Sequence, residues 1–148
     1  MWIILTYDRT VALWHSAQEK PRAKAEWEGT EPAPWVCSIG CCKRSDLAGT
    51  GWSNGLVRLW HVRPRGLVPI KDIWIEGGGF VNGVDFGDSG NRMAVAVGQE
   101  HRLGRWTRQK SAKNAIYLVD LEKGCEEQKD EVEQETEQEK DTLRNNRV

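Results

Sequence analysis

The stretch Gly49–Trp60, GTGWSNGLVRLW, contains an extended run, a tight turn and a second extended run that ends at a tryptophan. Two other stretches of equal length follow the same scheme: Ile3–Trp14 (IILTYDRTVALW) and Val95–Trp106 (VAVGQEHRLGRW). Their final tryptophans stand 46 residues apart: Trp14, Trp60 and Trp106. Six positions before each tryptophan is a polar residue able to organise a turn: Asp8, Asn54 and Glu100. The chain therefore contains a repeat, and we expect these tryptophans to be structurally equivalent.

A repeat of about 40–45 residues with such a hairpin is typical of WD40 arrays, in which each repeat builds a four-stranded blade of a β-propeller. Apolar side chains alternate before two of the tryptophans, as in strands that bury one face: Val11 and Leu13, then Val57 and Leu59. The sequence thus predicts an all-β fold, a partial WD40 β-propeller.

We divide the chain into four parts. Residues 1–33 should form the last three strands of a blade, 34–76 a complete blade, and 77–121 a C-terminal blade of four strands. In that last blade, Arg102–Trp106 is expected as the third strand and Ala115–Leu121 as the fourth. These parts make about two and three-quarter blades, whereas a closed propeller has about four to eight. Because open blade faces invite association, we expect a truncated copy of a larger ring, with completion by another chain as the alternative.

The last part, residues 122–148, differs in composition from the rest. Ten acidic and five basic residues fall in 121–148, which leaves 12 acidic and 16 basic residues in 1–120. We expect a solvated tail, disordered or weakly helical, with an acidic interaction segment as the alternative. Neither a secretory signal nor a membrane-spanning stretch is visible, so we expect an intracellular protein with no membrane partner.

The sequence offers no constellation of residues for catalysis or metal binding. The four cysteines, one adjacent pair among them, lack the two well-spaced pairs of a structural zinc site: Cys37, Cys41, Cys42 and Cys125. The glycines at 77–79 lack the lysine and hydroxyl residue of a phosphate-binding loop. We therefore expect no metal, no cofactor and no enzymatic activity.

The segment Gly98–Lys113, GQEHRLGRWTRQKSAK, is the candidate binding surface. It holds five cations and one acidic residue, Glu100, and the cations are the candidate RNA contacts: Arg102, Arg105, Arg108, Lys110 and Lys113. The repeat favours a packed Trp106 over one that stacks on a base. It also places Arg105 where other blades have an apolar residue, which favours an ion pair with Glu100, Asp85 or Asp88.

At this segment the chain resembles the WD40 subunits of the U3 small nucleolar ribonucleoprotein. Gly98–Trp106, GQEHRLGRW, is similar to that family's signature near the end of its last blade. The resemblance extends in order to three further stretches: Asp46–Trp60 (DLAGTGWSNGLVRLW), Gly79–Val84 (GFVNGV) and Ala112–Asn114 (AKN). Thr107 departs from the family pattern, which has a second tryptophan there, and Trp52 replaces a small residue.

The resemblance implies a seven-bladed propeller of which this chain holds the last blades. It also implies a nucleolar role in pre-ribosomal RNA processing for the small subunit, with three partners: the box B/C element of the U3 small nucleolar RNA, the small kink-turn-binding protein of the particle, and other small-subunit processome proteins. Two alternatives remain, a WD40 platform that binds proteins without RNA, and a truncated copy without function.

Overall fold

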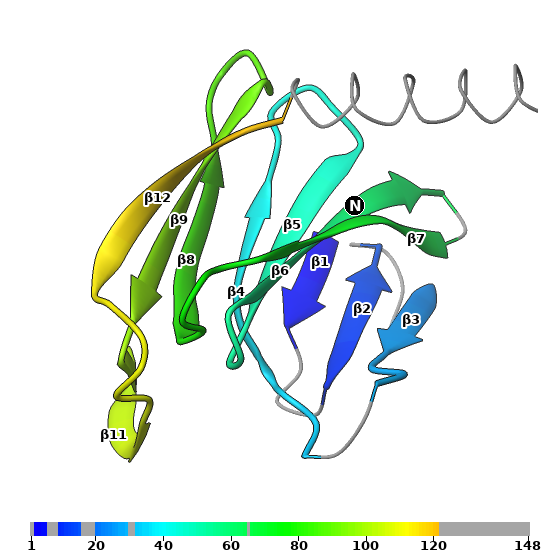
Figure 1. Ribbon diagram of the computed structural model, residues 1–148. Coiled ribbons are helices and arrows are strands. Elements are labelled where there is room, and N and C mark those ends of the chain that lie inside the picture. The colour runs from blue at the N-terminus through cyan, green and yellow to red at the C-terminus, as the bar shows by residue number, and fades with distance from the viewer. Residues whose placement is uncertain (1, 6–8, 16–19, 30–31, 65, 122–148) are drawn as a thin grey trace, which may run out of the picture.

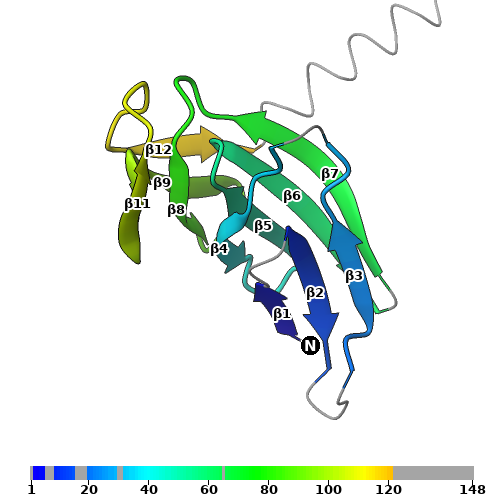
Figure 2. The ribbon, with the colours of Figure 1, turned by 90° about the horizontal axis from the view of Figure 1, so that it is seen from below.

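The computed structural model describes residues 2–5, 9–15, 20–29, 32–64 and 66–121, and side chains are described from Arg9 onward. All regular elements in these ranges are strands. Figures 1 and 2 show three antiparallel sheets that stand side by side, with a small hairpin projecting from the last of them. The turn residue Asp8 and the tail at 122–148 lie outside the described residues.

The first sheet has three strands in the order of the chain. They are β1 (Trp2–Leu5), β2 (Thr10–Trp14) and β3 (Ala23–Glu26). On β2, three consecutive side chains are buried: Val11, Ala12 and Leu13. Val11 and Leu13 share one face of the strand, as their alternation predicted, but Ala12 points to the other face, so both faces of β2 are covered at this point.

The second sheet is a four-stranded meander. Its strands are β4 (Val36–Cys41), β5 (Leu47–Trp52), β6 (Leu56–Arg63) and β7 (Gly66–Trp74). The turn between β5 and β6 is closed by Asn54, whose side-chain oxygen accepts a hydrogen bond from the amide of Leu56 at 3.2 Å. Gly55 follows with φ of 86°, a conformation that suits glycine. The tight turn expected from WSNG is therefore an Asx-type turn.

The third sheet departs from the expected strand order. Its strands are β8 (Phe80–Phe86), β9 (Arg92–Gly98) and β12 (Ala115–Asp120), in the order β12-β9-β8. Between β9 and β12 the chain forms a separate hairpin of β10 (Glu100–His101) and β11 (Gly104–Arg108). The prediction of Arg102–Trp106 as the third strand of this blade was wrong, because β12 pairs with β9 in that place.

Side-chain chemistry explains why β12 takes the place beside β9. The β12 sequence AIYLVD is almost wholly apolar, and its Tyr117 and Val119 pack against the core shared with the second sheet. The sequence GRWTR of β11 would instead have put the guanidinium of Arg105 between two blades. Burying a charge costs far more free energy than burying an alkyl side chain, so the apolar strand pairs with the sheet and the basic one is excluded.

Two cores fill the spaces between the sheets. The first joins the first two sheets through six buried residues: Val11, Val36, Ala48, Trp52, Leu56 and Trp60. The second joins the second and third sheets and has ten buried members: Cys42, Val57, Leu59, Ile75, Val81, Val84, Phe86, Met93, Val95 and Val97. Each sheet is therefore held to the next by side chains from both, as blades of a propeller are.

Within the first core, one hydroxyl serves two tryptophans. Thr50 is fully buried on β5, and its Oγ1 accepts hydrogen bonds from the indole nitrogens of Trp52 at 3.0 Å and Trp60 at 2.8 Å. The hydroxyl of Thr50 itself donates a long hydrogen bond to the carbonyl oxygen of Arg58 at 3.4 Å. The tryptophan that ends the second hairpin is thus anchored by a polar contact as well as by packing.

The outer face of the third sheet is exposed. Ile116 and Leu118 on β12 are 73% and 80% exposed, whereas Val57 and Leu59, which hold the corresponding positions on β6, are buried under the third sheet. The correspondence follows from the strand pairing. Leu59 pairs with Gly49 on β5, and Leu118 pairs with Ala94 on β9. In each sheet, this partner lies two residues before the position that faces the β-bulge of the first strand. The same face that is covered on one blade is therefore uncovered on the next.

Close backbone contact between the second and third sheets yields a first prediction. A Cβ on Gly40 would lie 2.3 Å from the carbonyl oxygen of Val84, a backbone atom that cannot move without shifting β8. We expect Gly40→Ala to lower the free energy of unfolding by about 1–3 kcal/mol, as overpacked cores do. Urea unfolding followed by tryptophan fluorescence measures the change. Gly66→Ala is the matched control, because nothing lies within 4 Å of its added Cβ; equal losses in both variants would contradict the argument.

Candidate nucleic-acid interface

The β10–β11 hairpin is tied to one end of the second and third sheets by amide side chains. Asn82 on β8 donates from its Nδ2 to the carbonyl of Glu100 at 2.9 Å, and its Oδ1 accepts from the amide of Arg102 at 3.0 Å. Gln109, just after β11, accepts from the amide of Gly79 at 2.9 Å and donates to the carbonyl of Ser53. The projecting hairpin in Figure 1 is therefore fixed at its base rather than attached by a single linker.

Further hydrogen bonds close the base of the hairpin itself. The backbone amide of Gln99 donates a hydrogen bond to Asn114 Oδ1 at 2.8 Å, and the Gln99 Nε2 donates to the carbonyl of Ala112 at 2.8 Å. The amide of Gln109 donates to the carbonyl of Gln99 at 2.9 Å. Backbone groups at both ends of the segment between β9 and β12 are therefore hydrogen-bonded within the segment, as expected for an ordered insertion.

Aromatic rings run from the body of the protein to the hairpin surface. Trp35 lies 5.9 Å from Phe80 between ring centroids, and Phe80 lies 6.0 Å from His101 in an edge-to-face arrangement. His101 then stacks on Trp106 at 5.5 Å with an interplanar angle of 23°. Phe80 is 1% exposed and Trp106 is 60% exposed, so the series leads from the core to solvent.

This geometry corrects two expectations about the hairpin. Trp106 lies outside the blade and is largely exposed, so it is not the structural equivalent of Trp14 and Trp60. Glu100 does not organise the turn: it pairs with Arg108 across the strands, and the turn is closed by His101, whose Nδ1 accepts from the amide of Leu103 at 3.3 Å. Both errors follow from the coincidence that a tryptophan within the insertion stands 46 residues after Trp60.

The five candidate cations gather on this hairpin and the loop after it, and all are exposed. Arg105 is ion-paired with Glu100 at 3.1 Å, one of the partners expected from the sequence, although its side chain is 87% exposed and does not lie between blades. Arg108 donates from Nε and Nη2 to the amide oxygen of Gln99 at 3.0 and 2.6 Å, and lies 4.0 Å from Glu100. Arg105 is therefore the nearer partner of Glu100, whereas Arg108 is held mainly by the uncharged side chain of Gln99.

The other three cations have no carboxylate partner among the described residues: Arg102, Lys110 and Lys113. Arg102 still acts on its neighbours. The pKa of His101 is lowered first by burial and second by the charge of Arg102, so His101 stays neutral and can accept the hydrogen bond from the amide of Leu103. The hairpin thus presents several unpaired positive charges around a neutral stack of rings.

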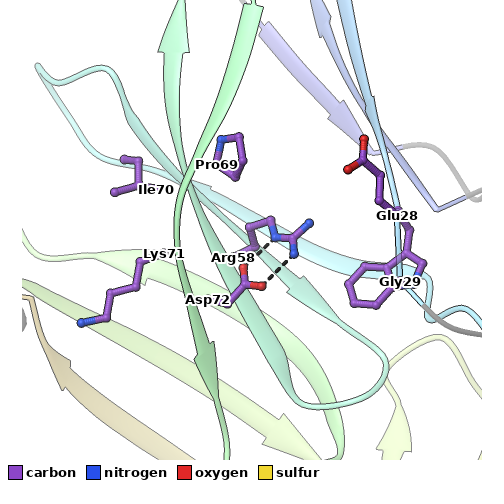
Figure 3. A pocket seen from close by; sticks show the side chains of 8 residues that line it. Glu28, Gly29, Arg58, Pro69, Ile70, Lys71 and Asp72 are labelled. Carbon is purple, nitrogen blue, oxygen red and sulfur yellow. Dashed lines mark hydrogen bonds and ion pairs between the residues drawn. The ribbon is translucent and has the colours of Figure 1, made fainter.

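A second surface feature lies between the first two sheets and was not expected from the sequence. It is a cleft of about 560 Å³ lined by Trp27, Glu28, Gly29, Arg58, Pro69, Ile70, Lys71 and Asp72. Arg58 makes two hydrogen bonds to the Asp72 carboxylate, at 2.6 and 2.7 Å, as Figure 3 shows. Its guanidinium also lies 5.4 Å from the ring centroid of Trp27. The guanidinium of Arg58 is therefore already paired with protein groups, and its hydrogen bonds to Asp72 raise the pKa of Arg58.

The cysteines are not gathered into a site. Cys37 and Cys42 are buried and Cys41 is exposed. Burial raises the pKa of Cys37 to about 12, so this side chain is a neutral thiol. Among the residues that the structure describes, no three His, Cys, Asp or Glu side chains are placed to hold a metal ion, and no helix could cross a membrane. Cys125 lies outside those residues.

Comparisons with known proteins agree on one group of relatives. No protein-family model matches the chain. The chain is 38% identical over 123 residues to U3 small nucleolar RNA-interacting protein 2 of Mus musculus, a match that covers 77% of this chain and 26% of that protein. It is 34% identical over 127 residues to U3 snoRNP-associated protein-like EMB2271 of Arabidopsis thaliana, covering 76% of this chain and 26% of that protein. The chain thus spans about a quarter of the length of the curated relatives it matches.

A solved structure gives the same result for the fold. The crystal structure of the WD40 repeats of RRP9 aligns with 80% of this chain and 38% of its own length, with a TM-score of 0.72 and 33% sequence identity. The predicted fold class is therefore confirmed: the described residues form blades of a partial WD40 β-propeller. By sequence and by fold, the chain is a WD40 relative of the U3 small nucleolar RNA-interacting proteins.

Proposed function

We propose that the chain is a WD40 scaffold that binds the U3 small nucleolar RNA within the U3 particle, in the nucleolus, and that it acts there in pre-ribosomal RNA processing and biogenesis of the small ribosomal subunit. The observation that carries this proposal is the β10–β11 hairpin with the loop after it, which exposes three cations without a carboxylate partner among the described residues, Arg102, Lys110 and Lys113, together with Arg108, which is held mainly by the uncharged Gln99. The names of the relatives support the choice of RNA.

Electrostatics explain why such a hairpin suits RNA. Each cation that neutralises a phosphate releases a condensed counterion, and this release provides much of the affinity at low salt. The hairpin projects past the ends of β8 and β9 in Figure 1, and its cations are exposed to solvent. The proposed partners are the box B/C element of the RNA, the small kink-turn-binding protein and other small-subunit processome proteins.

Filter binding to a box B/C hairpin over a salt series tests the proposal. With these four cations engaged, we expect the logarithm of the association constant to fall with the logarithm of salt concentration with a slope of about −3 to −4. An unrelated hairpin of equal length is the control for specificity. Affinity that is indifferent to salt, or equal for the two RNAs, would contradict the proposal. Repeating the titration with the kink-turn-binding protein present tests that partner.

A second candidate function has its own observation. The outer face of the third sheet exposes Ile116 and Leu118, and such apolar faces mark protein contacts. This face favours the alternative of a WD40 platform that binds proteins without RNA. Capture of the same processome protein before and after ribonuclease treatment, lost in an Ile116→Ser, Leu118→Ser variant, would favour it over the RNA-binding proposal.

A further inference from the structure

We propose that Trp106 is a stacking platform for one unpaired RNA base, with Arg108 beside it as the ligand of an adjacent phosphate. The proposal rests on the proposed RNA-binding function and specifies the kind of nucleotide involved. It requires a base that is single-stranded, bulged or flipped out, because a base inside a duplex has both faces covered by its neighbours. The hairpin would then read RNA structure at this point in addition to RNA charge.

The first support is how the indole is oriented. One face of the Trp106 ring is covered, since His101 stacks on it at 5.5 Å and 23°. One edge of the indole lies close to Gly104, because a Cβ added to that glycine would come within 2.8 Å of Trp106 Cε2. With one face covered by His101 and the residue still 60% exposed, we assign the exposure to the opposite face and the remaining ring edge. An open aromatic face of this kind is what a base needs for stacking.

The second support is rigidity. His101 is only 9% exposed and is itself backed by Phe80, which is 1% exposed and belongs to β8. The hairpin base is fixed by both ends of the Asn82 side chain. The indole is therefore presented on a supported surface, and a base that stacks there pays little additional entropy for ordering the protein.

The third support is the charge next to the ring. Trp106 and Arg108 stand two positions apart on β11, and both residues are exposed. The guanidinium of Arg108 is oriented by the neutral oxygen of Gln99, which leaves its charge available for a phosphate. A protein partner could also use an exposed tryptophan and arginine, but the surplus of cations over the single carboxylate of Glu100 favours a polyanion.

The test uses the whole 148-residue chain and a box B/C hairpin RNA, with a series of RNAs in which each unpaired nucleotide in turn is abasic. We expect Trp106→Ala to weaken binding about 5- to 150-fold, the usual effect of losing one stacked base, and Trp106→Phe to keep most of the affinity. The salt slope should stay unchanged, because no cation is removed. One of the abasic RNAs should bind the wild-type chain as weakly as the intact RNA binds Trp106→Ala. The same abasic RNA should show no additional loss of affinity when it binds Trp106→Ala.

Leu103→Ala is the matched control, because Leu103 is an apolar residue of the same hairpin and is 68% exposed, yet carries no ring. The Leu103→Ala variant should bind the box B/C hairpin with the same affinity as the wild type. RNA binding that survives Trp106→Ala unchanged overturns the platform and leaves the RNA-binding function standing. An equal loss for every RNA, a continuous duplex included, also overturns it, since the ring would then only support the hairpin. Absence of RNA binding by the wild type removes both proposals.

Discussion

Thr50→Val is expected to lower the free energy of unfolding by about 2–5 kcal/mol, although valine and threonine have nearly the same shape. The hydroxyl of Thr50 accepts from the indole nitrogens of Trp52 and Trp60, and the residue is fully buried. Valine removes the acceptor and leaves two buried donors without a partner. Each such orphaned donor costs about 1–3 kcal/mol, because its lost hydration is no longer compensated.

Guanidinium chloride unfolding followed by tryptophan fluorescence measures this loss. Thr50→Ser is the matched control: it keeps the acceptor oxygen and removes only a methyl group, so we expect it to lose about 1 kcal/mol. A further check is the cycle with Trp60→Phe, which removes one of the two donors. Thr50→Val should cost less in that background than in the wild type. If the valine variant unfolds at the same denaturant concentration as the serine variant, the shared hydroxyl is not what anchors the tryptophans.

The second blade shows where sequence patterns suffice. Its hairpin was foreseen from alternating apolar residues around Asn54 and Gly55, and the structure has that turn closed by the Asn54 side chain. Local physics decides such an element, since turn chemistry fixes the register and alternation fixes the buried face.

The third blade shows where sequence patterns fail. Two runs, at β11 and β12, were each able to pair with β9, and the 46-residue spacing favoured the wrong one. The outcome is decided by tertiary burial, because only Tyr117 and Val119 can extend the apolar core. A signal was present in the sequence: Arg105 stands where Leu13 and Leu59 stand in the other blades, and a charge at a core position argues against that strand assignment.

The candidate site was foreseen in part for the same reasons. Exposure of the cations follows from their charge, and the pair between Arg105 and Glu100 was one of those expected. The exposed Trp106 was not foreseen, since the repeat assigned that ring to a blade core. The role of Gln99 and Asn82 in fixing the hairpin also lay beyond the sequence, because their partners are brought close only by the folded loop.

Removing four cations of the β10–β11 hairpin and the loop after it, by Arg102→Gln, Arg108→Gln, Lys110→Gln and Lys113→Gln, is expected to weaken binding to the box B/C hairpin by about 10²- to 10³-fold at physiological salt. The estimate follows from counterion release, in which each lost phosphate contact removes about 0.7–0.9 from the salt slope. The slope should therefore fall by about three units, and the difference between the two chains should vanish as the salt concentration approaches molar. Filter binding across the salt series measures both quantities.

The position of the charges, rather than their number, is what this variant must test. A matched variant removes four exposed cations elsewhere, from the first two sheets and their loops: Lys24→Gln, Lys43→Gln, Arg63→Gln and Lys71→Gln. Both variants change the net charge by the same amount, so any general loss of attraction to a polyanion is common to them. We expect the second variant to lose less than about tenfold, because distant charges are screened beyond about 8–10 Å at this ionic strength. Equal losses in the two variants would mean that the RNA senses only the overall charge, and the hairpin would no longer be the interface.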